Sequence, residues 1–385
     1  LLVSANDAQK EHFIPPMARG EWTGTMCLTE PHCGTDLGML KTKAVDKENG
    51  TYEITGQKIF ISGGEHDLTD NIIHLVLARV EGDPEGVKGI SMFAVPKKLV
   101  DLSRNKVSCG AIEDKMGIHG SPTCVMNFDG ATGFLVGERC KGLQAMFIMM
   151  NEMRLGCAIH GLSQSELAYQ NALAYAKDRV QSAQITNPRG GAVSIIDHPD
   201  VRRMLLDVKS INEAARLLVL EAAMLSDKGD EESEDRLGLL TPVLKGVLTD
   251  YGVDNAIKMQ QVLGGHGYVR EWGMEQIVRD VRITQIYEGA NAKPLPPLTL
   301  AGVILEGGII DYNTNVLTGG TGFAVLGIGP YTQYNQDQVV ISLRLVSVQT
   351  GEVLTSVTIE KNLLSTQDGA TVMRFFNQNT KTFEF

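Results

Sequence analysis

The spacing of hydrophobic and polar positions predicts short strands in the first third of the chain. Residues 20–135 contain apolar runs and alternating segments typical of β-structure, and strands are expected over 71–79, 89–95 and 123–128. The segment 51–62, TYEITGQKIFIS, predicts two strands around a turn at Gly56. Before them, residues 5–18 have the pattern of a helix tail that ends at Pro15-Pro16.

A helical spacing of apolar residues follows, over residues 141–292. A long helix is predicted over 143–180 because apolar side chains recur along one face, namely Met146, Phe147, Met150, Leu155 and Ile159. A second helix is predicted over 199–227, and a third is predicted with Thr241 as its N-cap and Pro242 next. The pattern indicates a β domain followed by an antiparallel helical bundle.

The pattern changes again near residue 293. The segment 293–297, KPLPP, cannot continue a helix, and β-branched strand runs are predicted over 339–348 and 353–359 with a turn at 349–351. All six Cys, eight His and two Trp residues precede this point. We expect a domain boundary here, and the contrast would also fit a joint between two unrelated proteins.

Composition and charge narrow the function classes. The chain has 385 residues, 43% of them hydrophobic, and a formal net charge of −11, which argues against a disordered chain, a collagen and a nonspecific nucleic-acid binder. The six cysteines form no CxxC pair, which predicts reduced cysteines and a cytoplasmic location. No run of 18 apolar residues is present, so no transmembrane helix is expected. The first residues, LLVS, predict a chain that starts partway into something larger.

Several conspicuous features have ordinary structural interpretations when each is taken alone. The methionines between 146 and 153 are expected to fill a core, and the spacing of the histidines predicts no metal site. Residues 264–267, GGHG, and 319–322, GGTG, lack the context of a dinucleotide-binding fingerprint and are expected to form turns. Glu288, beside Gly289, would by itself be taken as a solvated surface carboxylate.

Four ordered segments change that interpretation. They are 25–36 (TMCLTEPHCGTD), 56–64 (GQKIFISGG), 261–268 (QVLGGHGY) and 279–289 (RDVRITQIYEG), and together they resemble the acyl-CoA dehydrogenase family. Residues 116–124, MGIHGSPTC, resemble a subfamily that often handles short or unusual acyl-CoA substrates. The resemblance implies a multi-domain α+β protein, with a remnant of an N-terminal helical domain (1–18), a β-barrel middle domain (19–136), a helical bundle that binds FAD and acyl-CoA (137–292), and a β-rich segment (293–385).

The resemblance implies an FAD enzyme that oxidises an acyl-CoA to the trans-2-enoyl-CoA. Glu288 matches the family's base, which removes the α-proton, while hydride passes from the β-carbon to flavin N5. Burial would raise the pKa of that carboxyl toward the working pH, and the Glu288 N–H would bond the thioester oxygen. In some relatives the base precedes an Arg in the long helix, but here Met153 precedes Arg154. Glu152 is a reserve candidate.

The remaining site residues are carried over motif by motif. The flavin ring would be contacted by Leu28, Thr29, Phe60 and Ser62. Its adenosine-pyrophosphate end would be contacted by Arg179, Gln261, Gly264 and Gly265, with Arg179 reaching the FAD of a neighbouring subunit. The substrate would be bound by Thr35, Asn151, Arg154, Tyr287 and Gly289. The resemblance implies a homodimer or homotetramer that passes electrons to an electron-transfer flavoprotein or a similar acceptor. The chain departs from the family pattern at Phe60, Ser62 and Ala290, where Trp, Thr and Thr are usual.

The segment from 293 onward has a different resemblance. Residues 298–312 (LTLAGVILEGGIIDY), GGTG at 319–322, GIG at 327–329, TQY at 332–334 and VSVQTGE at 346–352 resemble the curli-secretion channel family, whose members are ring-forming outer-membrane lipoproteins. The resemblance implies membrane-hairpin strands within 316–334 and 363–385. A soluble sheet edge is the alternative.

Three functions therefore remain open at the level of the sequence. The chain is an acyl-CoA dehydrogenase with an unrelated tail, a secretion-channel component whose tail carries the function, or a chimera in which neither half works.

Overall fold

The computed structural model describes residues 1–291 in full and the main chain of three later segments, 303–322, 328–347 and 353–372. The chain divides into two compact units, Leu1–Asn291 and Ala292–Phe385, which are described separately below. None of the helices in the described part of the chain combines the length and apolarity that a membrane crossing requires.

The first unit begins with a helix and a sheet. Helix α1 (Asp7–Ala18) precedes β1 (Trp22–Cys27), β2 (Lys43–Asp46), β3 (Tyr52–Ser62), β4 (Asn71–Val80), β5 (Ile90–Pro96), β6 (Val107–Ile112) and β7 (Thr123–Val136), with short 3₁₀ turns η1 (Leu37–Met39) and η2 (Gly86–Gly89) between strands. The strand order is β1-β4-β2-β3-β7-β5, with β6 on β7 and a further β4–β5 pairing. Large side chains, among them Ile54, Phe93 and Phe128, are fully buried in its core.

The expectation of a β-barrel is not confirmed, because the described seven-stranded sheet has short pairings between some neighbouring strands and strands with a free edge. Strands β2 and β4 share only two residue pairs, Lys43↔Arg79 and Ala44↔Val80. Strands β5 and β7 share three. Among the described strands, β1 pairs with β4 alone and β6 with β7 alone, so both keep a free edge.

The predicted turn at Gly56 is wrong. Residues 52–62 form the single strand β3, which pairs antiparallel with β7 and has register shifts between Ile54 and Thr55 and between Lys58 and Ile61. A Cβ atom on Gly56 would lie 2.3 Å from Oγ1 of Thr42. Glycine is therefore needed at position 56 because β3 approaches Thr42 closely, and not because the chain turns there.

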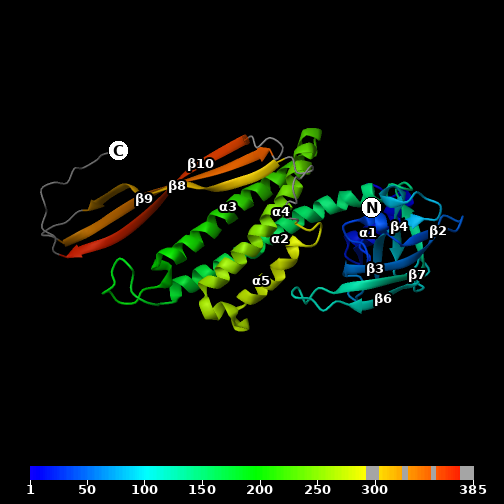
Figure 1. The fold of residues 1–385 in the computed structure, drawn as a ribbon, viewed down its shortest axis with the longest axis horizontal. Helices are drawn as coiled ribbons and strands as arrows, with labels where there is room; N and C mark the ends of the chain where they lie inside the picture. The colour runs from blue at the N-terminus through cyan, green and yellow to red at the C-terminus, as the bar shows by residue number, and fades with distance from the viewer. Residues whose placement is uncertain (292–302, 323–327, 348–352, 373–385) are drawn as a thin grey trace. The chain divides into compact units, whose positions relative to one another are not determined.

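The second half of this unit is a helical bundle. Its helices are α2 (Gly142–Asp178), α3 (Pro199–Lys228), α4 (Glu231–Val262) and α5 (Met274–Arg282), with 3₁₀ turns η3 (Ile195–Asp197), η4 (Gly264–Tyr268), η5 (Arg270–Trp272) and η6 (Ile283–Gln285). Figure 1 shows the first turns of α2 reaching the sheet, where a Cβ on Gly142 would lie 2.3 Å from the main chain of Ser91. Helices α2 and α4 approach closely through Gly161 and Gly252.

Two predicted helix ends are wrong. Helix α1 continues through Pro15 and Pro16 to Ala18, and the N–H of Arg19 still donates to the Pro15 carbonyl at 3.1 Å. Helix α4 begins at Glu231, ten residues before Thr241, because Asp230 is the N-cap and accepts from the N–H of Ser233. Thr241 lies inside the helix and donates to the carbonyl of Leu237.

The sheet and the bundle are joined by side chains of α5. The Asp280 carboxylate accepts from the N–H of Ile118 at 2.6 Å, and the Arg279 guanidinium donates to the Met116 carbonyl at 2.9 Å. The segment 116–124, which the sequence singled out, is therefore the part of the β domain that contacts α5 through these bonds.

The second unit is a three-stranded antiparallel sheet in the order β10-β9-β8. Its strands are β8 (Val303–Gly322), β9 (Ile328–Ser347) and β10 (Val353–Val372), with register irregularities in β8 between Ile309 and Asp311 and between Asn313 and Leu317. The strand run predicted over 353–359 lies within β10, and most of the run over 339–348 lies within β9. The predicted turn at 349–351 and the segment 293–297 lie outside the described residues.

Candidate functional site

Glu288 lies on a short segment between η6 and the end of the first unit. Its φ is +54°, in the left-handed region, and Gly289 follows with φ +97°. Two consecutive residues of this kind reverse the chain direction sharply, and the non-glycine residue is disfavoured in that conformation. The side chain is partly buried against helices α2 and α4.

The Glu288 carboxyl group has the environment that general-base chemistry requires. Its Oε2 atom is buried and has no hydrogen-bond partner among the described residues. Burial raises the pKa of this carboxyl above its usual 4.5, while the charges of Arg154 and Lys245 act in the opposite direction. A carboxylate that is shielded from water but unpaired is suited to accept a proton from a bound molecule.

Helix α2 supplies the neighbours on one side of this segment. The Arg154 Nε donates to the main-chain carbonyl of Glu288 at 3.4 Å, and the guanidinium group lies 5.6 Å from the ring centre of Phe147. Almost two turns later, the His160 ring lies 3.1 Å from the hydroxyl of Tyr287. Burial raises the pKa of that hydroxyl, so Tyr287 is neutral at physiological pH. The structure thus brings together Arg154, Tyr287, Glu288 and Gly289, whereas Asn151 is exposed on the same helix.

The two segments assigned to the flavin ring are hydrogen-bonded to each other. The N–H of Ile59 donates to the Thr29 carbonyl at 2.9 Å, and the buried Lys58 ammonium donates to the Leu28 carbonyl at 3.0 Å. The same ammonium pairs with the buried carboxylate of Glu30 at 2.8 Å. The Lys58 charge and several hydrogen bonds outweigh the effect of burial and hold the pKa of Glu30 below its usual value.

Phe60 and Ser62 follow Lys58 along β3 and remain open to solvent. Phe60 is apolar but 60% exposed. Its φ of +60° lies in the left-handed region. An exposed aromatic ring on a strained main chain is a candidate contact for a planar ligand. Thr35 is also exposed, in the loop after the Thr29 segment.

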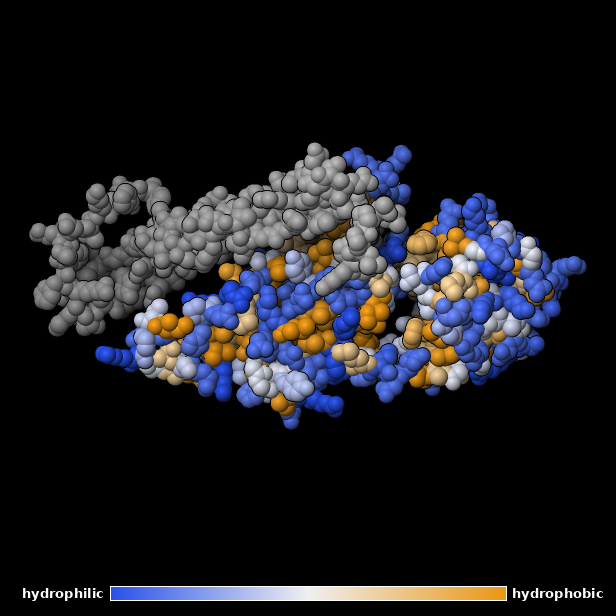
Figure 2. Space-filling view, in the orientation of Figure 1, coloured by the Kyte–Doolittle hydropathy of each residue, from blue (hydrophilic) through white to orange (hydrophobic). Residues whose placement is uncertain are grey.

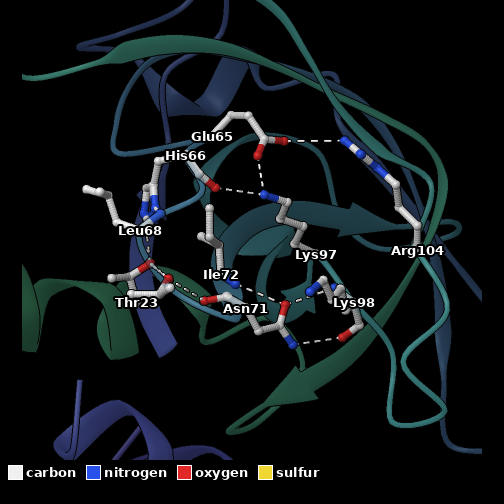
Figure 3. Close-up of polar contacts among 10 residues, drawn as sticks. Thr23, Glu65, His66, Leu68, Asn71, Ile72, Lys97, Lys98 and Arg104 are labelled. Carbon is white, nitrogen blue, oxygen red and sulfur yellow. Dashed lines mark hydrogen bonds and ion pairs between the residues drawn. The ribbon is translucent and has the colours of Figure 1, made fainter. Parts of the chain in front are cut away.

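The loop after Ser62 is anchored by charged and polar groups (Figure 3). The Glu65 carboxylate pairs with Lys97 and with Arg104, and Lys97 also donates to the His66 carbonyl at 2.9 Å. The His66 ring lies 3.0 Å from the Thr23 hydroxyl on β1. These contacts fix the end of β3, and with it the positions of Phe60 and Ser62.

The predicted adenosine-pyrophosphate residues lie at the opposite end of α2. Arg179, just after the helix, lines a cavity of about 470 Å³ together with Leu263 and His266, which flank Gly264 and Gly265. The His266 ring stacks on Trp272 at 4.7 Å and lies 2.8 Å from the Tyr175 hydroxyl. Gln261 is exposed on the last turn of α4.

One chain does not bring the two groups together. Arg154 and Arg179 are both placed by α2, and 25 residues at a rise of 1.5 Å per residue separate them by about 37 Å. The residues predicted to contact the adenosine end therefore lie far from Arg154 and from the Glu288 segment that it contacts.

Sequence reasoning missed Lys58, Glu30 and Lys245. Lys58 occupies an inward-facing position of β3, in phase with Ile54, and this period-2 pattern could have signalled a buried cation that needs a partner. Lys245 gave no such local signal, since its acceptors lie 44 and 46 residues away.

Two other features carry no assignment to the site. The ligand atoms of Glu30, His32 and Cys33 lie within 4.8 Å of one another, but the Glu30 carboxylate already accepts from Lys58 and Thr42. A cavity of about 610 Å³ between α1 and the sheet is lined by Phe13, Trp22 and Phe134 and contains none of the predicted site residues.

Three family models match parts of this chain. Family models described as "Acyl-CoA dehydrogenase, middle domain" and "Acyl-CoA dehydrogenase, C-terminal domain" match residues 25–131 and 141–293. A third, "Curli production assembly/transport component CsgG", matches residues 272–384.

Curated relatives and solved structures support the same family. A 3-methylmercaptopropionyl-CoA dehydrogenase of Ruegeria pomeroyi is 43% identical over 80% of this chain and 54% of its own length. An acyl-CoA dehydrogenase of Bacillus subtilis is 35% identical over 76% of this chain and 71% of its own. The structure of butyryl-CoA dehydrogenase from Megasphaera elsdenii is 32% identical, covers 74% of this chain and 69% of its own, and has a TM-score of 0.64. The chain spans about half the length of the first of these relatives. From its two matched domains and these identities, the chain belongs to the acyl-CoA dehydrogenase family.

Proposed function

We propose that this chain oxidises an acyl-CoA thioester to the trans-2-enoyl-CoA, with Glu288 as the base and FAD as the oxidant. The observation that carries the proposal is the Glu288 carboxyl group, which is partly buried and has an unpaired, buried Oε2 atom. A carboxylate on the surface would instead be solvated, and its pKa would not be raised by burial.

Glu288 would remove the α-proton of the substrate. The proton passes to its carboxylate, and the electron pair of the broken C–H bond becomes the new α,β double bond as hydrogen leaves the β-carbon with two electrons. No described residue accepts a hydrogen bond from the Glu288 N–H, which leaves this donor available for the thioester oxygen. The Arg154 contact to the Glu288 carbonyl supports the geometry of that N–H.

The residues present fit a flavin. Thr29 and Phe60 lie on segments joined by the Ile59–Thr29 hydrogen bond, and the exposed Phe60 ring offers a planar surface for stacking. Leu28 and Ser62 flank them. FAD, when bound, would supply the redox chemistry by accepting the two electrons and one hydrogen from the β-carbon. The buried Lys58–Glu30 ion pair, with the bond from Lys58 to the Leu28 carbonyl, supports these two segments.

We propose that the FAD site is completed by a second copy of the chain. The distance along α2 supports this, because Arg179 and the residues near it lie farther from Arg154, and so from the Glu288 segment that Arg154 contacts, than one FAD molecule spans. Hydrophobic residues are also exposed on the face of the bundle seen in Figure 2. On α3, Leu217, Leu220 and Met224 recur at helical spacing and are 55–63% exposed, which suits a helix face covered by another subunit.

The substrate, acceptor and location are part of the same proposal. Thr35 and Asn151 would contact the CoA portion and the acyl entrance, and the relatives named for butyryl-CoA and 3-methylmercaptopropionyl-CoA favour a short acyl chain. A solved structure titled "Electron transferring flavoprotein of Acidaminococcus fermentans" is 31% identical with a TM-score of 0.65, which favours an electron-transfer flavoprotein as acceptor. Six free cysteines favour the cytoplasm.

Flavin absorbance tests the proposal. The purified chain should carry FAD, and butyryl-CoA or 3-methylmercaptopropionyl-CoA should bleach it. Glu288→Gln should keep the flavin but abolish bleaching, because an amide cannot accept the proton. Glu152→Gln discriminates the reserve candidate. Should that variant stop bleaching while Glu288→Gln does not, Glu152 is the base.

A second candidate function rests on the match of residues 272–384 to the curli component and on the three-stranded sheet β8–β10. On this alternative the chain contributes to an outer-membrane secretion channel. Ring assembly in detergent without bound flavin would favour it over the enzyme. Aggregation with neither flavin nor rings would favour a chimera in which neither half works.

A further inference from the structure

Lys245 is a buried cation that contacts the Glu288 segment. The residue lies on α4 and is only 4% exposed. Its Nζ atom donates to the main-chain carbonyl of Gly289 at 2.5 Å and to Oδ1 of Asn291 at 2.8 Å. Both acceptors are neutral, so no ion pair through these contacts offsets the burial of the charge.

The Glu288 segment is fixed to α4 through Asn291 as well. The Asn291 Nδ2 donates to the Gly246 carbonyl, to the Thr249 hydroxyl at 2.7 Å and to the Asp250 carboxylate at 2.8 Å. The main chain of both left-handed residues is therefore held, by Arg154 through the Glu288 carbonyl and by Lys245 through the Gly289 carbonyl. Asn291 holds the chain two residues further on.

We propose that Lys245 is a positioning residue for Glu288. Lys245 fixes the main chain at Gly289, the next residue, and places a positive charge near the Glu288 carboxyl group. This inference rests on the function proposed above and deepens it. The titratable groups that face Glu288 are Arg154 and Cys157 on α2, Lys245 on α4, and Tyr287 on its own segment. Of these, the cations Arg154 and Lys245 favour the ionised carboxylate.

Three variants separate the position of the main chain from the charge. Lys245→Gln keeps a hydrogen-bond donor but removes the charge, and Lys245→Arg keeps both. Lys258→Gln is the matched control, because Lys258 lies on the same helix and its Nζ atom is 3.4 Å from the Asp207 carboxylate. Each protein is assayed for bound flavin by absorbance, and then for the rate of bleaching by a saturating short acyl-CoA as a function of pH.

We expect Lys245→Gln to keep its flavin and to bleach roughly 10- to 100-fold more slowly, as displaced catalytic groups do. The pH of half-maximal bleaching should also move upward, because one of the two cations that favour ionised Glu288 is lost. Lys245→Arg should restore part of both properties, and Lys258→Gln should match the wild type. A purely structural role would not move the pH profile.

The inference is overturned when the wild type bleaches and Lys245→Gln does so with the same rate and pH profile. A wild-type chain that binds flavin but never bleaches refutes the proposed function, and the inference with it. Should Lys245→Gln not fold, Asn291→Ala removes one acceptor of the ammonium group and the links to α4 while keeping the charge. That variant should bleach more slowly with an unmoved pH profile, and a wild-type rate would again overturn the inference.

Discussion

The Asp280 carboxylate accepts a 2.6 Å hydrogen bond from the main-chain N–H of Ile118, 162 residues earlier in the chain. This bond ties the loop of the sheet to the helix that leads directly into η6 and Glu288. The loop reaches Asp280 only because the residue before Ile118 is Gly117. A Cβ atom there would lie 2.6 Å from the Asp280 carboxylate and 2.8 Å from the main chain of Arg279.

Gly117→Ala should therefore destabilise the first unit by about 1–3 kcal/mol, as overpacking against a fixed main chain does. Urea denaturation and flavin retention measure the effect. Gly120→Ala is the control, since nothing lies within 4 Å of a Cβ added at Gly120. Equal stability of the two variants would show that the contact between loop and helix is loose.

The pH dependence of bleaching should follow the ionisation of Glu288. Burial raises the pKa of this carboxyl above 4.5, and only the ionised form accepts a proton. The rate should therefore rise with pH and reach half its maximum above pH 4.5, as stopped-flow bleaching would show. A rate already at its plateau at pH 4.5 would contradict this.

Folding stability should show the same ionisation with a defined sign. The folded chain binds this proton more tightly than the unfolded chain, so the contribution of Glu288 is fully present below pH 4.5 and is lost as pH rises through the folded-state pKa. Over that window the free energy of unfolding of the wild type should fall relative to that of Glu288→Gln. Parallel pH profiles would mean that the carboxyl is solvated.

Lys58→Met should unfold the β domain at much lower urea concentration. Lys58 is 0% and Glu30 3% exposed, and removing one partner of a buried pair leaves the other charge uncompensated, at about 3–5 kcal/mol. Lys47→Met is the matched control, because its pair with Glu53 is exposed to solvent and should contribute little to stability. Similar losses for both would show that water reaches the Lys58–Glu30 pair.

Deleting residues 293–385 should leave the FAD content per chain unchanged or raise it. The four core clusters of the first unit draw their buried residues from Ala5 to Val281, so that unit has its own cores. Flavin absorbance of the shortened chain, compared with the full chain, is the measurement. A large loss of FAD would show that the tail is integral to the cofactor site.

The sequence predicted the elements whose signals are local. The strand at 71–79 and the helix that begins at Pro199 agree with β4 and α3 within a residue or two. The start of α4 was missed because Pro242 suggested a first turn, although Asp230 and the acidic residues after it form a stronger start signal.

Features that depend on a distant partner could not be predicted. Gly56 has the sequence signature of a turn, but its role depends on the contact with Thr42. The roles of Lys58 and Lys245 depend on acceptors far along the chain. Glu288 was found through its motif. The burial that makes its carboxyl group unusual comes from helices α2 and α4, which begin 146 and 57 residues earlier.

The left-handed main chain at Glu288 has a consequence for how this position tolerates change. Such a conformation costs a residue with a side chain roughly 1–2 kcal/mol, and glycine is spared that cost. Folding alone would thus favour glycine at 288, whereas the proposed proton abstraction requires the carboxylate. Selection for thermal stability alone would therefore favour Glu288→Gly, which would give a more stable protein without the proposed base.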